Sequence, residues 1–156
     1  MCDDPDSDNK IDKATRDWST GIYATAATKA ALTGLITGSF PDPVGIILAS
    51  GAVPYFLLCH ESSGEGYAMA GIEMNGNELA GKSLIATVFP APPATGVSFA
   101  AGEGIALLPS GKPSIDEETQ RMISDICHEL CTDYDLPADL VVTISVPGAA
   151  GIALVA

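Results

Sequence analysis

Blocks of apolar residues with two different spacings run along this chain, and they predict two helices and a set of short strands. Residues 20–37 are rich in alanine, hold a single lysine and end before Gly38, which predicts a helix whose small side chains let it lie close to a sheet. A second helix is expected after Ser114, where apolar residues recur at intervals of three and four. Ser114 and Glu117 match a capping box, so Ser114 is the expected N-cap. The core face of this helix is predicted to hold Ile115, Thr119, Met122, Ile123, Ile126, Cys127 and Leu130.

Short apolar runs bounded by Gly, Asn, Ser or Pro predict the strands. These runs cover residues 44–49, 53–59, 67–74, 83–89 and 140–147, the last with alternating β-branched residues. Residues 89–96 read as a stiff extended link, and the sequence that follows passes through a glycine-rich turn. The pattern predicts an α+β (or α/β) fold, in which a mixed β-sheet of about five to six strands is packed by two main helices as a single domain.

The first 17 residues differ in composition from the rest. They contain six aspartates and almost no apolar side chain, so burial would not offset the entropy lost on ordering them. We expect residues 1–17 to be a mobile acidic leader and residues 18–156 to form the globular domain. The chain shows neither a signal-peptide pattern nor an apolar run of about 18 residues, so a cytoplasmic protein is expected.

The charge balance narrows the choice of partners. The chain has 20 acidic and 7 basic residues, for a net charge of -13, and such a field repels nucleic acid and anionic membranes. We therefore expect no nucleic-acid or membrane partner, although a salt-rich host would also explain the acidity. An anionic ligand would have to be met by backbone N–H groups, by helix N-termini or by the four basic residues outside the leader, Lys29, Lys82, Lys112 and Arg121.

The cysteines do not suggest a disulfide framework in a chain of this length without an export signal. We expect free thiols at Cys2, Cys59, Cys127 and Cys131. His60 and His128 directly follow Cys59 and Cys127, and Cys131 lies three residues beyond His128, but the spacings match no common zinc pattern. Buried thiols on the core face of the second helix are the favoured interpretation, and no protein-bound metal is predicted.

The tripeptide Gly-Glu-Gly occurs twice, at residues 64–66 and 102–104. Neither copy lies in the strand, spaced-glycine and helix arrangement that a dinucleotide site needs. A tight turn with a left-handed glycine is the favoured reading of the first copy.

Three well-separated stretches carry a more specific pattern. Residues 19–32, STGIYATAATKAAL, place a glycine and threonines before an alanine-rich run that holds a lysine. Residues 99–123 contain a glycine-rich turn, a helix start and an Arg-Met-Ile ending, and residues 140–148 form a strand that ends in Val-Pro-Gly. In content and order these stretches resemble the cobalt-precorrin-5B C(1)-methyltransferases, the CbiD family of anaerobic cobalamin biosynthesis.

The chain departs from that family's pattern in several places. An acidic Asp-Asp-Pro-Asp turn of the family is replaced by HESSGEGY at residues 60–67, and a cysteine usual in the first signature is Tyr23. The segment at residues 109–111 looks shortened. The resemblance covers nearly all of this chain but only about the first half of the family's length, so the glycine-rich second half, expected to hold part of the cofactor site, has no counterpart in this sequence.

The resemblance implies methyl transfer from S-adenosylmethionine to ring carbon C-1 of a cobalt-bearing tetrapyrrole. Such a reaction depends on positioning and water exclusion more than on acid–base groups, so no catalytic residue is assigned. The alternative is a truncated, non-catalytic corrinoid-binding or assembly protein. A second chain that supplies the missing half would make this one part of a split enzyme.

The same resemblance suggests which residues bind the carboxylate-rich substrate. Lys29 and Glu103 can also be explained without a ligand, because a lysine on a helix can extend to water and a glutamate in a turn can simply be solvated. The residues suggested are Thr20, Gly21 and Thr25 at the helix mouth, the basic Lys29, Lys112 and Arg121, and the turn Gly102, Glu103 and Gly104.

Overall fold

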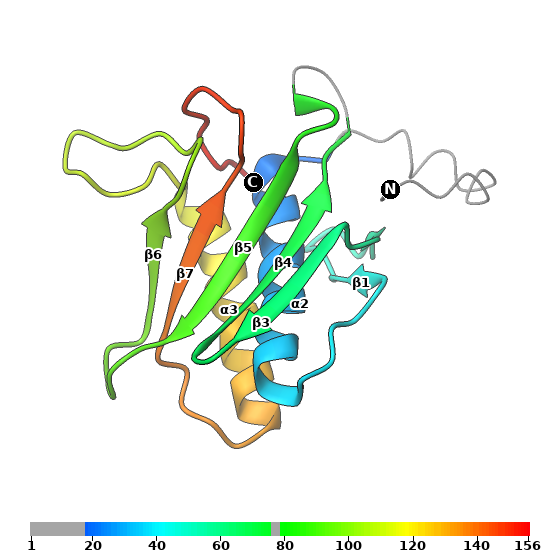
Figure 1. The fold of residues 1–156 in the computed structure, drawn as a ribbon, viewed down its shortest axis with the longest axis vertical. Helices are drawn as coiled ribbons and strands as arrows, with labels where there is room; N and C mark the ends of the chain where they lie inside the picture. The colour runs from blue at the N-terminus through cyan, green and yellow to red at the C-terminus, as the bar shows by residue number, and fades with distance from the viewer. Residues whose placement is uncertain (1–17, 76–78) are drawn as a thin grey trace.

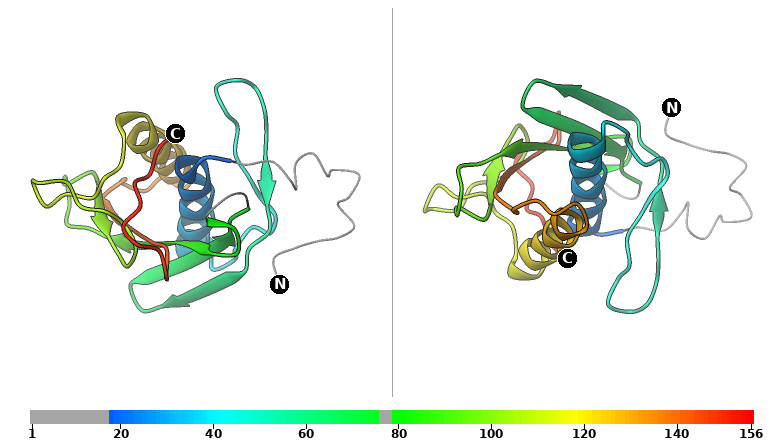
Figure 2. Two further views of the ribbon diagram at one scale, coloured as in Figure 1. Left: turned by 90° about the horizontal axis from the view of Figure 1, so that it is seen from above. Right: turned by 90° about the horizontal axis from the view of Figure 1, so that it is seen from below.

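The computed structural model describes residues 18–75 and 79–156, so the predicted leader and Cys2 lie outside the described residues. Its main feature is a five-stranded sheet with two helices against one face (Figures 1 and 2). Across the sheet the order is β3 (His60–Gly64), β4 (Tyr67–Glu73), β5 (Ser83–Pro90), β7 (Leu140–Ser145) and β6 (Val97–Ala101). All neighbours are antiparallel except β6 and β7, which are parallel. The predicted mixed sheet with two helices is confirmed.

Helix α2 (Thr20–Thr37) is confirmed at the bounds that its alanine-rich sequence predicts. The Ser19 side chain caps its start by accepting a hydrogen bond from the N–H of Ile22, and Gly38 ends it with a φ of 82°. The helix lies against β4, β5 and helix α3 (Glu117–Asp133). Close packing on several sides requires small side chains, and the helix residues without any exposed surface include Ala24, Ala26, Ala27 and Ala30.

The N-cap of α3 differs from the prediction. Asp116, not Ser114, is the cap, and its Oδ1 accepts a hydrogen bond from the N–H of Thr119 at 2.8 Å. Ser114 instead has extended backbone paired on both sides, since its N–H donates to Ala106 O and its carbonyl accepts from Leu154 N. That pairing prevents the helix from starting before Asp116. The predicted core face is confirmed at Thr119, Ile123 and Cys127, which are fully buried.

Strand prediction succeeded for β4, β5 and β7, failed in the region between α2 and the sheet, and missed β6, whose residues were taken as part of a glycine-rich turn. The runs at 44–49 and 53–59 form only the two-residue strands β1 (Val44–Gly45) and β2 (Tyr55–Phe56), which pair as a separate hairpin. Strand β3 was not predicted, because its five residues are polar or glycine and exposed at the sheet edge. It pairs with β4 through a turn at Glu65 and Gly66, and Gly66 has a φ of 80°. The first Gly-Glu-Gly is therefore the tight turn that was expected.

Candidate functional site at one end of the sheet

Both helices run in the same direction, and their N-termini lie at the end of the sheet where β6 and β7 finish (Figure 1). Helix N-termini are common positions for anion sites, because backbone N–H groups point outward there, and ligands also often bind beyond the carboxyl ends of parallel strands. Residues 146–156, the closing segment, cross this end of the molecule. Their hydrogen bonds decide which parts of the sequence meet.

The closing segment is bound first to the second Gly-Glu-Gly turn. The N–H of Val146 donates to Glu103 O at 2.7 Å, and the N–H of Ile152 donates to Gly104 O at 2.8 Å. The Glu103 side chain takes part as well, since its Oε2 accepts from the N–H of Gly148 at 3.2 Å. The turn therefore has a defined place beside the end of β7.

The two glycines of this turn are required by close approach of the backbone. A Cβ atom on Gly104 would collide with the carbonyl oxygen of Val146, and Gly104 has a φ of 83°. A Cβ on Gly102 would collide with the Ser145 hydroxyl and lie 3.0 Å from Ile144 O. A residue with a side chain would push the turn away from β7.

The closing segment is bound next to the mouth of α2. Gly21 N donates to Val155 O at 2.8 Å, and Val155 N donates to the Thr20 hydroxyl at 2.9 Å. That hydroxyl in turn donates to Ala153 O at 3.1 Å. A Cβ on Gly21 would lie 2.8 Å from Val155 O. Thr20 and Gly21 thus hold the closing segment against the helix.

The closing segment also reaches the start of α3. Asp116 N donates to Leu154 O at 3.0 Å, and Ala156 N donates to Asp116 Oδ2 at 3.0 Å. The three stretches singled out in the sequence are therefore joined at one end of the fold. The closing segment joins them through backbone hydrogen bonds, and no side-chain motif in its sequence indicated this role.

A pocket of about 310 Å³ opens at the mouth of α2. This volume is near the lower end of the range for small-molecule sites, about 300 to 1,000 Å³. The Tyr23 hydroxyl accepts a hydrogen bond from Asn75 N at 3.0 Å inside it. Its walls are largely apolar or aromatic, with hydroxyls from the helix start: Trp18, Ser19, Thr20, Tyr23, Met74, Asn75, Leu79, Ile152, Ala153 and Val155.

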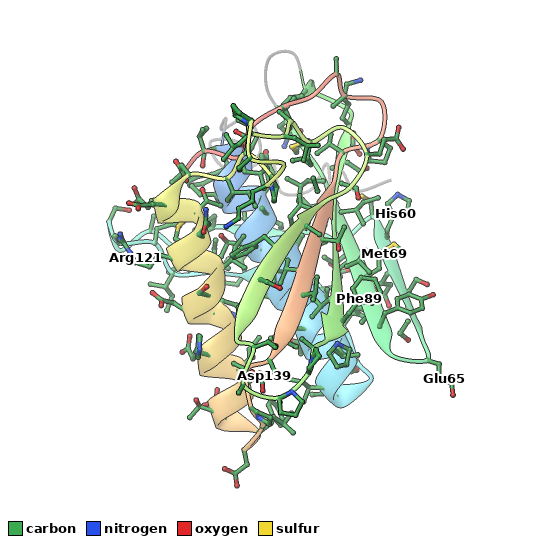
Figure 3. The ribbon with its side chains drawn as sticks, turned by 90° about the vertical axis from the view of Figure 1, so that its left-hand side faces the viewer. His60, Glu65, Met69, Phe89, Arg121 and Asp139 are labelled. Carbon is green, nitrogen blue, oxygen red and sulfur yellow. The ribbon has the colours of Figure 1, made fainter. Side chains whose placement is uncertain are left out.

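Four of the residues suggested by the sequence lie apart from this junction or have their polar groups engaged. The Thr25 hydroxyl is buried and donates to Gly21 O at 2.8 Å within the helix. The Lys29 ammonium donates to Gly45 O at 2.6 Å, which ties α2 to β1. Lys112 is exposed on the loop between β6 and α3. Arg121 projects from α3 on the side away from β3 and β4 (Figure 3).

Sequence reasoning missed Lys82 as a residue of this end. Its half-buried side chain comes from the segment just before β5, and its Nζ lies 3.6 Å from the position that a Cβ on Gly148 would occupy. Lys82 is therefore a cation beside the contact between Gly148 and Glu103. The only sequence signal was the scarcity of basic residues, because Lys82 lies outside the three matched stretches.

Asp116 is the carboxylate whose pKa the fold shifts at this junction. Partial desolvation acts to raise the pKa, but hydrogen bonding by Thr119 and by the N–H of Ala156 outweighs it, so the pKa of Asp116 lies below its usual value. The charged form is favoured in the folded state. Asp116 therefore stabilises the folded protein above the ordinary carboxyl pKa of about 4.

We expect Asp116→Asn to lower the free energy of unfolding at neutral pH and to lose this effect in acid. The wild-type advantage should shrink as the pH falls through the depressed pKa of Asp116, because the protonated carboxyl and the amide are then both uncharged. Asparagine keeps the capping oxygen, so the change isolates the charge. Urea unfolding of both proteins across the acid range measures this, with Asp125→Asn on the exposed side of α3 as the control. A difference that is constant with pH would contradict the assignment.

The described cysteines are free thiols, as predicted. Burial, reinforced by the neighbouring Cys131, raises the pKa of the Cys127 thiol to about 12. Burial and the nearby Asp139 carboxylate raise the pKa of Cys131. Within residues 18–75 and 79–156 there is no group of three or more His, Cys, Asp or Glu side chains placed to hold a metal ion.

Alkylation with iodoacetamide at mildly alkaline pH should modify Cys59 and leave Cys127 and Cys131 intact in the native protein. Cys59 is partly exposed, whereas the other two are buried and protonated, and only the thiolate reacts. Mass spectrometry of the digested protein gives the modified fraction of each. In urea all three should react, which serves as the control. Modification of native Cys127 as fast as Cys59 would contradict the buried placement.

No helix in the described part of the chain is long and apolar enough to cross a membrane. A protein-family model described as CbiD matches residues 7–155. A cobalt-precorrin-5B C(1)-methyltransferase from Brucella anthropi is 54% identical over 149 residues, which is 88% of this chain and 40% of the relative. The corresponding enzyme from Brucella melitensis is 55% identical over 148 residues, 87% of this chain and 40% of the relative.

A solved structure has the same fold. The crystal structure of a cobalamin biosynthesis protein (cbiD) from Archaeoglobus fulgidus matches with a TM-score of 0.66 at 18% identity, over 99% of this chain and 60% of that one. This chain thus spans about two fifths of the length of the curated relatives it matches. The family model covers residues 7–155, which include the three stretches that the closing segment joins, and the chain belongs to the CbiD family.

Proposed function

We propose that this chain forms part of a cobalt-precorrin-5B C(1)-methyltransferase, with its substrate bound at the junction of α2, the second Gly-Glu-Gly turn and the closing segment. The observation that carries the proposal is that one backbone segment joins the three family-like stretches beside a pocket. The identity of 54% to a relative of that name supports the reaction. Cytoplasmic action on a cobalt-bearing tetrapyrrole follows from the same proposal.

The helix termini at this end differ in a way that suits an anionic substrate at α2. The first turn of α2 holds no acidic residue, whereas Glu117 and Glu118 occupy the first turn of α3. The positive end of the α2 dipole can therefore attract a substrate carboxylate, while the N–H groups of Gly21 and Ile22 are engaged by Val155 O and the Ser19 side chain. Lys82 adds a charge at the same end. The apolar and aromatic walls of the pocket suit the edge of a flat macrocycle.

S-adenosylmethionine would supply the methyl group, whose bond to sulfur breaks as the new carbon–carbon bond forms, leaving S-adenosylhomocysteine. In this chain Glu103 is the residue we assign to a polar contact with the positively charged donor, because the N–H of Gly148 holds its carboxylate at the junction. The remaining length of the family, on the same polypeptide or on a second chain, would complete the site. In this arrangement the chain contributes by binding, orientation and exclusion of water.

Calorimetric titration tests the proposal. The chain is titrated with S-adenosylmethionine alone and after loading with a cobalt corrinoid that carries free carboxylates. Saturable binding of the methyl donor in either condition is expected, followed by a mass assay for transfer. Corrinoid binding without donor binding would favour the non-catalytic corrinoid-binding protein, which the span of two fifths of the relatives' length also allows. Binding of neither would overturn the proposal.

Glu103→Gln should weaken S-adenosylmethionine binding about tenfold, since a charge-assisted contact is worth about 1.5 kcal/mol. Glutamine keeps an oxygen for Gly148 N, so the turn should remain in place. Glu65→Gln is the matched control, because Glu65 lies in the β3–β4 turn, far from the junction (Figure 3). Equal donor affinities of the Glu103 variant and the wild type would remove Glu103 from the site and leave it as a turn carboxylate.

A further inference from the structure

The face of the sheet opposite the helices is uncovered by any described element (Figures 1 and 2). The alternate residues of β4, β5 and β7, such as Ala70, Ala86 and Val142, are fully buried against the helices. Residues between them point to the other side, because side chains alternate along a strand. Met69 and Phe89 lie on this uncovered side, away from α2 and α3 (Figure 3).

Three rows of cross-strand neighbours make up what we call the open face. Tyr67 and Phe89 are in ring contact in the first row, with centroids 6.2 Å apart. From β3 to β6 the rows are Gly64, Tyr67, Phe89, Val141 and Ser98; Ser62, Met69, Thr87, Thr143 and Ala100; and His60, Gly71, Ile85 and Ser145.

None of the residues in these three rows is Asp, Glu, Lys or Arg, although the chain has a net charge of -13 and 17% charged residues. The next pair on the same face, Glu73 and Ser83, places a carboxylate at the end of β4, at the edge of these rows. A water-facing side of an antiparallel sheet normally carries the polar half of an alternating pattern. Here the middle of the face is Met69, Thr87, Ile85 and Phe89, and Phe89 is 38% exposed. Depletion of charge around apolar side chains is typical of the core of a protein–protein interface.

Two possible occupants of this face come from this chain itself, and neither suits it. A second copy would bring together two bodies that each have a net charge of -13, which repel each other. Residues 1–17 contain six aspartates and almost no apolar side chain, so they offer little surface to an uncharged sheet.

The family relationship provides an occupant. The match covers only 40% of the Brucella anthropi relative and 60% of the Archaeoglobus fulgidus structure, so these proteins have a large further part that must pack somewhere. We infer that the open face is the docking surface for this further part of the CbiD-family length, which places an apolar, uncharged layer on it. The inference rests on the proposal that this further part completes the enzyme, but it concerns assembly and its test requires no methyl transfer.

The test mixes this chain with the unmatched part of the Brucella anthropi relative, produced as a separate polypeptide, and measures mass by light scattering after size exclusion. A one-to-one complex is expected. Thr87→Arg in the middle of the open face should weaken it at least about tenfold, because a charge would be buried without a partner. Thr132→Arg, at an exposed position of α3, is the matched control and should leave the complex unchanged. Circular dichroism verifies that both variants fold.

A second readout needs no variant. Oxidation of Met69 by hydrogen peroxide, measured by mass spectrometry, should slow in the complex, whereas oxidation of Met122 on α3 should not. Absence of a complex, or a complex that survives Thr87→Arg with Met69 still oxidised at the free rate, would overturn the inference. A dimer of this chain alone that Thr87→Arg dissociates would also overturn it, since a second copy would then be the occupant.

Discussion

Gly104→Ala is expected to lower the free energy of unfolding by about 4 kcal/mol, the sum of strain at a left-handed residue and overpacking against backbone. Gly104 has a φ of 83°, and its added Cβ would collide with the carbonyl oxygen of Val146. That oxygen is a backbone atom at the end of β7, so it cannot move aside by a side-chain rotation. The turn and the closing segment should separate.

The matched control is Gly148→Ala, followed with the same urea unfolding curves. Gly148 has a similar φ of 87°, but its Cβ would meet only the Lys82 ammonium at 3.6 Å. This variant should lose about 1 kcal/mol, the cost of the backbone conformation alone. If the two variants lost equal stability, the close approach between the turn and β7 would be wrong.

Gly21→Ala is the second substitution with a large expected effect, a loss of about 3 kcal/mol. The new methyl group would collide with the Thr119 hydroxyl and lie 2.8 Å from Val155 O. It would therefore separate α2 from both α3 and the closing segment. Because Gly21 N donates to the same Val155 O, the pocket at the helix mouth should open, and binding of the corrinoid should weaken together with stability.

Gly34→Ala on the same helix controls for the substitution itself. Its Cβ would meet the ring of Phe40, a partly exposed side chain that can rotate away. Alanine also favours a helix over glycine by about 1 kcal/mol, so the stability of this variant should stay within about 1 kcal/mol of wild type. Thermal unfolding of the two variants side by side would contradict the account if Gly34→Ala were the less stable.

Local sequence patterns predicted those helices and strands that are determined by residues close in sequence. The alanine-rich run gave α2 its bounds, since its packing depends on small side chains at most of its buried positions. The predicted N-cap at Ser114 was wrong, because Ser114 pairs with Leu154, 40 residues further along the chain. That pairing keeps the backbone at Ser114 extended. Strand β3 has no apolar alternation, so only its pairing with β4 reveals it.

The site could be predicted in part for the same reason. The Gly-Glu-Gly turn and the start of α2 were noticed as stretches, but the segment that joins them does so through backbone hydrogen bonds, which leave no residue pattern. The predicted substrate role of Lys29 stays a prediction; what the sequence could not show is that its ammonium donates to Gly45 O, a contact set by the β1–β2 hairpin. Lys82 is brought to the junction by the tertiary fold, which no local sequence pattern predicts.

Mapping of amide chemical shifts by NMR tests most directly whether the junction is the substrate site. The labelled chain is titrated with a diamagnetic cobalt(III) corrinoid that carries free carboxylates. The account predicts that the shifted amides cluster at the start of α2, in the second Gly-Glu-Gly turn and along the closing segment, residues 146–156, with Gly21, Gly104 and Val155 among them. Shifts confined to the β1–β2 hairpin beside Lys29, or to the open face of the sheet, would contradict it.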